Sequence, residues 1–371
     1  MKRSLALLTG LGLVSSAFLA PAAVADDGDT DLGNLTVLAT TDIHGRQLNY
    51  DYFTGEPYGT GDKALGMEHL ATAIEQTRSA KGEDSTVLLD NGDANQGNPL
   101  ATYYQKNRSA STVDPMASVF NLLGYDAGVV GNHEFNYGLQ ASAQYKDSLA
   151  MPLLAANVID ARTGQPAYEP YTMINKTVGG ETVQVGVIGV VTPGVRVWDK
   201  ATVEGNLEFR DTAATAAEWA PKVKAAGADV VIVLAHTGLD ATGYTYNPAD
   251  LNENIAQSVA EQSTDVDVVV GGHSHVTNKV QEYFTNKNGE PVLFTQPGYW
   301  ARFLSEVTLP LVKDADGEIE VKWDETGRPT AAPLAAGNYA ADPRIRAAIE
   351  PYHTETTQWV QTVVAQATED M

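Results

Sequence analysis

Five apolar runs of β type in this chain each end in a short tail that carries aspartate, asparagine or histidine. The runs cover residues 35–41, 86–89, 127–130, 230–235 and 266–270, and the tails that follow them are Asp42-Ile43-His44, Asp90-Asn91-Gly92-Asp93, Gly131-Asn132-His133-Glu134, His236 and Gly271-Gly272-His273-Ser274-His275. Five of the seven histidines of the chain lie in these tails. Because ligands bind beyond the carboxyl ends of the strands in an open α/β sheet, we expect the tails to meet at one polar site.

Segments of helical period alternate with these β runs. Apolar residues at spacings of three and four predict a helix over 65–80. Asp114-Pro115 predicts the start of another helix, which Gly124 ends. Further helices are expected over 140–150, 212–226 and 251–261. The alternation is typical of an α/β layered fold, and the later β runs over 183–191, 291–295 and 303–311 indicate a second sheet packed on the first.

The first 25 residues have the layout of a secretory signal peptide. Lys2-Arg3 precede an apolar stretch over 5–20, and Ala23-Val24-Ala25 is a small-residue cleavage site before Asp26. An N-terminal membrane anchor is the alternative, but the apolar run is short and interrupted. We therefore expect cleavage near Ala25, release into the periplasm or the medium, and no stable membrane insertion. Residues 26–34 would form an acidic leader.

Seven residues in the tails are candidate metal ligands: Asp42, His44, Asp93, Asn132, His236, His273 and His275. In each Asp-x-His or His-x-His pair the two donors share one side of an extended segment, because side chains alternate with period two. With one bridging carboxylate, the set supplies four donors to each of two metals. A two-metal site polarises a phosphoryl group and activates a water. The sequence therefore indicates two divalent ions and a phosphoryl substrate.

Composition limits the metals and the partners. The chain has no cysteine, which excludes disulfides and thiolate ligands and leaves nitrogen and oxygen donors that suit Mn, Zn, Fe, Co or Mg. The formal net charge of −23 at pH 7 repels long polyanions and argues against a nucleic-acid polymer as partner. A small phosphate ester is compatible, because two divalent ions outweigh the carboxylates around them. The sequence gives no indication of the oligomeric state.

The tails, in this order along the chain, resemble the motifs of the calcineurin-like metallophosphoesterases. The motifs are Asp-x-His, Gly-Asp, Gly-Asn-His-Glu, a solitary histidine and Gly-His-x-His. The resemblance implies a four-layer α-β-β-α sandwich of two mixed sheets flanked by helices. It also implies that one metal is held by Asp42, His44, Asp93 and His275, and the other by Asp93 as the bridge, Asn132, His236 and His273. His133 would contact the phosphate and protonate the leaving oxygen.

Within this family the chain is similar to the secreted nucleotidases, above all to bacterial bifunctional 2′,3′-cyclic-nucleotide 2′-phosphodiesterase/3′-nucleotidases. The segments that carry this likeness are 90–100, 131–139, 156–163, 198–201 and 297–300. In 5′-nucleotidases an aspartate that orients the catalytic histidine normally stands at the position of Asn136, and many have glutamine at the position of His275. Asn136 is therefore expected to act with His133. The implied reaction opens 2′,3′-cyclic nucleotides to 3′-nucleotides and then releases nucleoside and phosphate.

The likeness also predicts the domain organisation. It covers about 35–344, so the catalytic domain is expected to span 35–343. Enzymes of this type usually carry a second, C-terminal domain whose aromatic residues stack the nucleobase, and we expect 344–371 to be a helical linker to that domain, which is absent here. His353 would lie on the solvated surface of this helix.

Other functions remain open at this point. A 5′-nucleotidase or a broad phosphomonoesterase of the same family is the nearest alternative, and Asn136 argues against it. A non-catalytic secreted module that binds metal or nucleotide is a second, although a pure binder needs no acid such as His133 beside its metals. A third is a structural partner that has lost its other half.

Overall fold

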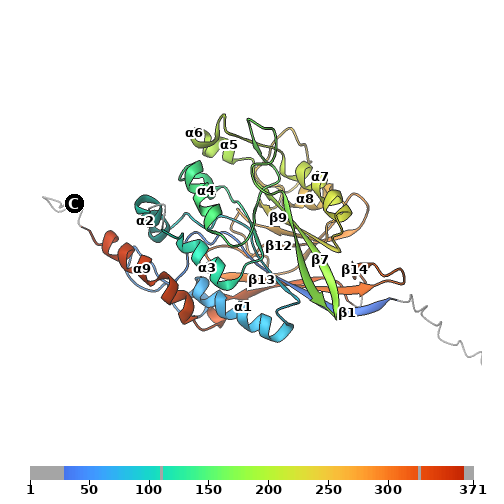
Figure 1. Cartoon of the computed structure of the whole chain (residues 1–371), viewed down its shortest axis with the longest axis horizontal. Helices are drawn as coiled ribbons and strands as arrows, with labels where there is room; N and C mark the ends of the chain where they lie inside the picture. The colour runs from blue at the N-terminus through green and yellow to red at the C-terminus, as the bar shows by residue number, and fades with distance from the viewer. Residues whose placement is uncertain (1–28, 109–111, 325–326, 363–371) are drawn as a thin grey trace, which may run out of the picture.

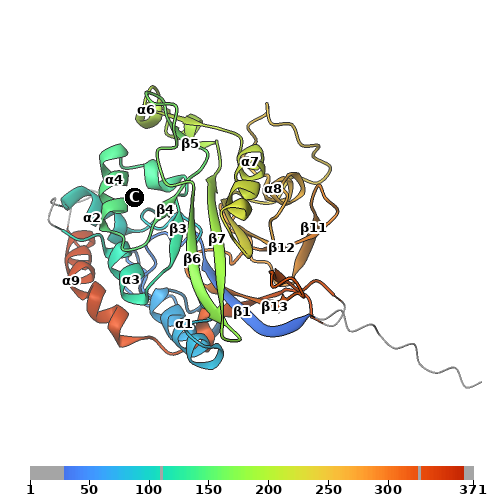
Figure 2. The same cartoon turned by 45° about the vertical axis from the view of Figure 1, so that its right-hand side comes forward.

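The structure is a computed structural model that describes residues 29–108, 112–324 and 327–362; the predicted signal peptide lies outside these residues. Two mixed β-sheets pack face to face, and helices cover the outer face of each (Figure 1). The turned view in Figure 2 separates the helices of one sheet from those of the other. The predicted four-layer α-β-β-α sandwich is thereby confirmed.

The first sheet has seven strands in the order β14-β13-β1-β2-β3-β4, with β15 also paired to β13. Their bounds are β1 Thr30–Thr40, β2 Thr86–Asp90, β3 Ala127–Val129, β4 Leu153–Leu154, β13 Phe303–Lys313, β14 Ile319–Val321 and β15 Thr330–Ala335. Strands β1 to β4 are parallel, and β13 runs antiparallel to β1. The carboxyl ends of β1, β2 and β3 therefore lie at one edge of this sheet.

The second sheet has six strands in the order β11-β12-β10-β9-β7-β6. Their bounds are β6 Tyr171–Val178, β7 Glu181–Val191, β9 Val230–His236, β10 Val268–Gly271, β11 Glu282–Thr285 and β12 Pro291–Thr295. The four central strands are parallel, and the two edge strands are antiparallel to their neighbours. A separate antiparallel pair is formed by β5 Val158–Asp160 and β8 Leu207–Phe209.

Helices on the outer face of the first sheet are α1 Met67–Lys81, α2 Pro99–Asn107, α3 Pro115–Leu123, α4 Leu139–Ser148 and α9 Pro343–Val360, and those on the second sheet are α7 Thr212–Ala225 and α8 Ala256–Gln262. Two short helices, α5 Val195–Trp198 and α6 Lys200–Val203, follow β7. Single 3-10 turns lie at η1 Gly61–Lys63, η2 His133–Phe135 and η3 Ala336–Asn338. Helix α3 begins as predicted, since the Asp114 side chain accepts from the N–H of Met116, and Gly124 ends it in the left-handed conformation.

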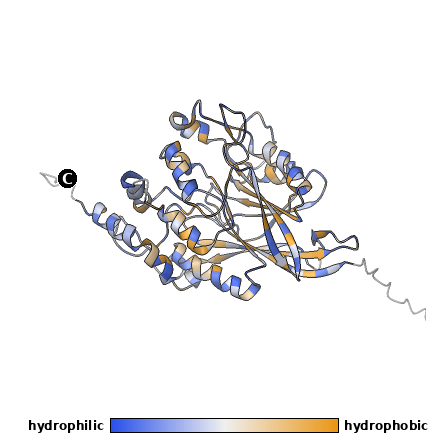
Figure 3. Ribbon diagram, viewed as in Figure 1, coloured by the Kyte–Doolittle hydropathy of each residue, from blue (hydrophilic) through white to orange (hydrophobic). Residues whose placement is uncertain are grey.

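The core consists of three apolar layers that alternate with the sheets and helices. The layer between the sheets is largely made of β-branched and leucine side chains such as Val37, Val187 and Val268, all fully buried. A second layer lies under α1 and α3, and a third, rich in alanine and valine, lies under α7 and α8. In Figure 3 much of the orange colour of hydrophobic residues lies along the strands in the interior of the molecule. Because both faces of the central strands are buried, their sequences read as continuous apolar runs.

Three elements differ from the sequence prediction. The run over 303–311 was assigned to a second sheet, but β13 pairs along nearly the whole length of β1 and so belongs to the first. This pairing also starts β1 at Thr30, ahead of the apolar run. Helix α8 begins at Ala256 and not at 251, because Leu251 has φ 46° and cannot continue a right-handed turn.

Helix α9 packs against α1, α2 and α3. Ile345 and Ile349 on its inner face are fully buried. His353 is 8% exposed, and its Nδ1 lies 2.9 Å from the hydroxyl of Tyr52. The prediction that His353 is solvated is therefore wrong, because a helix with an apolar stripe buries whatever polar residue shares that stripe. In the described part of the chain, no helix is both long and apolar enough to cross a membrane.

Candidate metal centre

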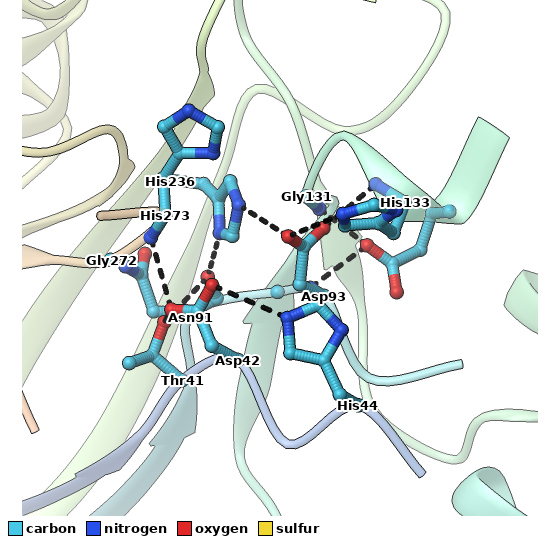
Figure 4. A network of polar contacts seen from close by, with 12 residues as sticks. Thr41, Asp42, His44, Asn91, Asp93, Gly131, His133, His236, Gly272 and His273 are labelled. Atoms are coloured by element: carbon cyan, nitrogen blue, oxygen red, sulfur yellow. Dashed lines mark hydrogen bonds and ion pairs between the residues drawn. The ribbon is translucent and has the colours of Figure 1, made fainter. Parts of the chain in front are cut away.

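The five tails meet where the two sheets come together. Asp42 and His44 follow β1, Asp93 follows β2, and Asn132 and His133 follow β3, all in the first sheet. The second sheet contributes His236 at the end of β9, and His273 and His275 after β10. Figure 4 shows side chains from both sheets pointing toward Asp93 and Asp42. The structure thus brings the seven candidate ligands and His133 to one site, and their roles as ligands stay a prediction.

Most of these side chains stand on strained backbone. A positive φ, which residues other than glycine rarely adopt, is found at Asp42 (50°), His44 (51°), Asp93 (57°), His273 (65°) and His275 (58°). Such conformations cost about 1–3 kcal/mol each and persist only where the surroundings enforce them. Hydrogen bonds between loops do this here, since the N–H of Asp42 donates to the Gly92 carbonyl and that of His44 to the Asp93 carbonyl, both at 2.9 Å.

Asp42, His44 and His275 form a first donor group, whose ligand atoms lie within 4.8 Å of one another. Asp42 Oδ1 is 3.4 Å from His275 Nε2 and 3.9 Å from His44 Nε2. His44 Nδ1 donates to the carbonyl of Gln96 at 2.8 Å, because a carbonyl can only accept. That bond leaves the lone pair on Nε2, the nitrogen turned to the other donors.

Asp93, His236 and His273 form a second group within the same distance limit. His236 Nε2 lies 3.1 Å from Asp93 Oδ2, while its Nδ1 donates to the Asn91 carbonyl at 2.6 Å. His273 Nε2 lies 2.8 Å from Glu253 Oε1, which leaves Nδ1 as its free donor atom. Outer bonds of this kind fix the ring planes of metal-ligating histidines.

Asp93 stands between the two groups. Asp93 belongs to the second group. It also forms a third group with His44 and His133, and through His44 this third group is connected to the first. Its Oδ1 accepts from the N–H of His133 at 2.7 Å, and its Oδ2 faces His236. This carboxylate is placed where a ligand shared by two ions would lie.

Two buried oxygen atoms of the candidate ligands test whether these residues fit a metal. Within the described residues, Asp42 Oδ1 and Asn132 Oδ1 have no hydrogen-bond partner. Asp42 is fully buried and Asn132 is 5% exposed. An unsatisfied buried polar atom costs about 1–3 kcal/mol, and divalent ions held by oxygen and nitrogen donors would remove that cost. The donor set therefore fits a metal centre.

Burial and charge set the protonation of the histidines in opposite directions. Burial lowers the pKa of His44 and of His273 below the ordinary value, which keeps both imidazoles neutral. Burial alone would also lower the pKa of His236, but the Asp93 carboxylate raises it to about 10. In turn, although burial opposes it, the charge of His236 holds the pKa of Asp93 well below its usual range. His44, His273 and Asp93 thus have the protonation states that metal ligands require, whereas His236 would have to lose its proton to bind an ion.

Two glycines allow the loops to approach this closely. Gly92 has φ 85°, and a Cβ on it would lie 2.5 Å from the Gly131 nitrogen. A Cβ on Gly131 would collide with Asp93 Oδ1. Glycine at these two positions therefore lets the loops after β2 and β3 pack closely around Asp93.

Glu134, the last residue of the Gly-Asn-His-Glu tail, holds the loops of β2 and β3 together. Its Oε2 accepts from the N–H groups of Asp93 at 2.9 Å and Gly131 at 2.6 Å, and its Oε1 from that of Ala94 at 2.8 Å. It is 2% exposed. The sequence predicts no role for Glu134. Its position directly after His133 is the one sequence feature that points to it.

We expect Glu134→Gln to lower the free energy of unfolding by about 1–3 kcal/mol for each N–H donor that faces the new amide NH2. Urea unfolding of the metal-free protein measures this. Glu204→Gln, a change from carboxylate to amide on an exposed side chain, serves as the control and should leave stability within about 0.5 kcal/mol. Equal stability of the two variants would contradict this role.

His133 and Asn136 also lie together, on the turn η2 and directly after it. His133 Nδ1 lies 2.6 Å from Asn136 Oδ1, and His133 Nε2 lies 3.9 Å from Asp93 Oδ2. The Asn136 Nδ2 group lies 3.0 and 2.9 Å from the two carboxylate oxygens of Asp199. Asp199 lies in the segment 198–201 that carries the likeness to the nucleotidases, but the sequence predicts no role for it, since it is 63 residues away from Asn136 in the chain.

Two aromatic rings cover the second-sheet histidines. The Trp198 ring stacks on His273 with centroids 5.4 Å apart, and the Tyr299 ring stacks on His275 at 4.8 Å. Trp198 is 47% exposed. The N–H of Trp300 donates to the Asp42 carbonyl at 2.7 Å, which ties the loop after β12 to the centre. Residues 299–300 therefore border the site.

Comparisons with known proteins agree with this geometry. The family model described as calcineurin-like phosphoesterase matches residues 35–277. The chain is 34% identical over 366 residues to the 2′,3′-cyclic-nucleotide 2′-phosphodiesterase/3′-nucleotidase of Haemophilus influenzae, covering 93% of this chain and 53% of that protein. It is also 34% identical over 385 residues to the trifunctional nucleotide phosphoesterase protein YfkN of Bacillus subtilis, covering 98% of this chain and 25% of that protein.

A solved structure shows the same fold. The crystal structure of calcineurin-like phosphoesterase YfkN from Bacillus subtilis superposes with a TM-score of 0.79 at 32% identity, over 90% of this chain and all of the other. The chain spans between a quarter and about half of the length of the two relatives named above. The match of the family model, the identity to these relatives and the shared fold establish that the chain belongs to the calcineurin-like phosphoesterase family.

Proposed function

We propose that this protein is a metal-dependent phosphoesterase that opens 2′,3′-cyclic nucleotides to 3′-nucleotides and then hydrolyses these to nucleoside and phosphate. The observation that carries the proposal is the meeting of donor groups around Asp93 with His133 at the same point. The name of the Haemophilus influenzae relative, at 34% identity over 93% of this chain, supports the substrate class.

We assign the ligands as the sequence predicts. Asp42, His44 and His275 with Asp93 would hold one divalent ion, and Asn132, His236 and His273 with Asp93 the other. The three donor groups and the unpartnered oxygens of Asp42 and Asn132 support this assignment. Mn, Zn, Fe, Co and Mg all accept such nitrogen and oxygen donors. Bound ions would supply Lewis-acid polarisation of the phosphoryl group and activation of a water.

His133 would supply the proton for both steps. When water attacks phosphorus in the cyclic ester, the bond from phosphorus to O2′ breaks, and the imidazolium form of His133, which keeps Nδ1–H on Asn136, would give its Nε2 proton to O2′. The ring would take up a proton from solvent before the second step repeats this transfer at O3′. A ribose oxygen needs protonation to leave, since an unprotonated alkoxide is a strong base. The Oδ1 atom of Asn136 accepts from Nδ1–H of His133 and so orients the imidazole with Nε2 toward the centre.

The other parts of the proposal rest on the sequence. The net charge of −23 favours small nucleotides over nucleic-acid polymers as substrates. The layout of residues 1–25 supports secretion to the periplasm or the medium. We propose 35–343 as the catalytic domain and 344–371 as a helical linker to a further domain, with α9 docked on α1, α2 and α3.

The decisive test is phosphate release by the purified chain on 2′,3′-cyclic AMP, 3′-AMP, 5′-AMP and bis-p-nitrophenyl phosphate. We expect no turnover after EDTA treatment, and recovery with Mn²⁺ on the cyclic ester and 3′-AMP. Product analysis should show 3′-AMP as the intermediate and adenosine as the end product. Turnover of the nitrophenyl ester alone would retain the metal chemistry and overturn the nucleotide substrate. No metal-dependent turnover of any ester would overturn the whole proposal.

A 5′-nucleotidase is the second candidate function. The same panel separates it, because 5′-AMP would then be hydrolysed faster than 3′-AMP. The resemblance of Asn136 and His275 to the cyclic-phosphodiesterase branch argues against this outcome.

A further inference from the structure

The side chain of Asn136 is an amide, so either its oxygen or its NH2 group can point toward His133. With its oxygen toward His133 it accepts a hydrogen bond, and with its NH2 group it donates one. The two choices require opposite tautomers of the imidazole. Something beyond Asn136 must therefore decide which nitrogen of His133 carries the proton.

Asp199 fixes the orientation of the Asn136 amide. Its two carboxylate oxygens lie 3.0 and 2.9 Å from Asn136 Nδ2. An ionised carboxylate can only accept, so the NH2 group of Asn136 must face Asp199 and its Oδ1 must face His133. His133 Nδ1, at 2.6 Å from that oxygen, must then be the protonated donor. The chain of bonds leaves Nε2 as the nitrogen that exchanges the catalytic proton.

The turn between α5 and α6 holds Asp199 in place. The N–H of Asp199 donates to the Val195 carbonyl at 2.9 Å, and its own carbonyl accepts from the N–H of Thr202 at 2.8 Å. Trp198, the preceding residue, stacks on His273 of the proposed metal centre. Lys200, the following residue, pairs with Glu204 at 3.3 Å. The α5–α6 segment therefore packs on the proposed metal centre and holds the Asp199 carboxylate next to Asn136.

The Asp199 side chain has no local structural task that would explain it. It stands at the N-terminus of α6 without a side-chain capping bond. Its carboxylate contacts a neighbouring loop, 63 residues earlier in the chain. Replacement of Asp199 should therefore leave the α5–α6 turn folded.

We propose that Asp199 is a positioning residue for the phosphoester reaction: it fixes the amide of Asn136, which fixes the ring and the proton of His133. This inference rests on the proposed function of His133 as the proton donor.

Three variants test the proposal: Asp199→Asn, Asn136→Asp and the double variant N136D/D199N. Asp199→Asn replaces a group that can only accept by an amide that can also donate, so residue 199 no longer fixes the orientation of Asn136. The kcat on 3′-AMP should then fall about 10- to 100-fold, as for other residues that orient a functional side chain through a hydrogen bond. Asn136→Asp sets two carboxylates about 3 Å apart, and their repulsion should cause a similar loss. In the double variant the acid and the amide exchange places, and most of the lost activity should return.

The leaving group separates positioning from a structural role. p-Nitrophenolate leaves without a proton, so Asp199→Asn should reduce kcat on bis-p-nitrophenyl phosphate much less than kcat on 3′-AMP. KM should change little for either ester. Glu204→Gln, the same chemical change in the same segment on an exposed side chain, should leave both rates unchanged. Equal losses on both esters, or no recovery in the double variant, would overturn the proposal.

A spectroscopic readout keeps the inference testable if the protein hydrolyses no nucleotide. The ¹⁵N chemical shifts of the His133 ring in the metal-free chain report which nitrogen carries the proton. At a pH at which the ring carries one proton, we expect that proton on Nδ1 and a free Nε2 in the unaltered chain, and a mixture of tautomers in Asp199→Asn. An unchanged tautomer in Asp199→Asn would refute the role of Asp199, whatever the activity panel shows.

Discussion

His133→Ala should lower kcat on 3′-AMP by about 10²–10⁴-fold while the bound metal stays in place. This range is the usual contribution of a positioned general acid, and the leaving ribose oxygen needs its proton. His133 is not among the seven proposed ligands, and its Nδ1 is already engaged by Asn136. Steady-state kinetics on 3′-AMP, with metal content measured by elemental analysis of the same sample, tests both halves of the expectation.

Two comparisons sharpen this test. His69→Ala removes a histidine on α1 whose Nδ1 contacts the Tyr339 carbonyl away from the site, and it should leave kcat unchanged. Bis-p-nitrophenyl phosphate should lose far less rate than 3′-AMP in His133→Ala, because its leaving group needs no acid. Loss of metal together with activity would instead make His133 a ligand, a role that its place in a donor group with His44 and Asp93 allows geometrically.

The sequence predicted the layered fold and the place of the site because both depend on local patterns. An apolar run shows a buried strand, and the polar tail after it shows which edge the ligands occupy. Strands β2, β9 and β12 lie close to the predicted ranges for this reason. Local patterns could not predict which sheet β13 joins. That depends on its pairing with β1, whose residues are hundreds of positions away in the chain.

Site residues could be predicted from the sequence where they belong to a rare residue type. They could not be predicted where they belong to a common one. His236 and His273 stood out among only seven histidines. Glu134 and Asp199 belong to 47 acidic residues, and only the structure shows four backbone N–H groups on the one and the Asn136 amide on the other. The left-handed backbone at Asp42 was equally hidden, because aspartate gives no sign of it in the sequence.

Asp93→Asn should abolish metal binding and activity together. Asp93 is the carboxylate that stands between the donor groups, so its charge would serve both ions, and the amide keeps its size but not its charge. We expect the loss of kcat on 3′-AMP to exceed about 100-fold, the upper end of what an outer-shell change costs. Metal content after dialysis should fall in parallel, and excess Mn²⁺ should restore only part of the rate.

Asp90→Asn is the matched control, because Asp90 lies on the same strand end and is as buried as Asp93. Its Oδ1 accepts from the Thr40 hydroxyl at 2.8 Å and its Oδ2 from the N–H of Gly92 at 3.1 Å, so it serves the loop and not the centre. Burial raises the pKa of Asp90 well above its usual range, so the loss of a negative charge should matter less at this position than at Asp93. Asp90→Asn should therefore keep its metal and most of its rate. If both variants lost metal equally, the loop and not the bridging charge would be the cause, and the assignment of Asp93 as the shared ligand would fail.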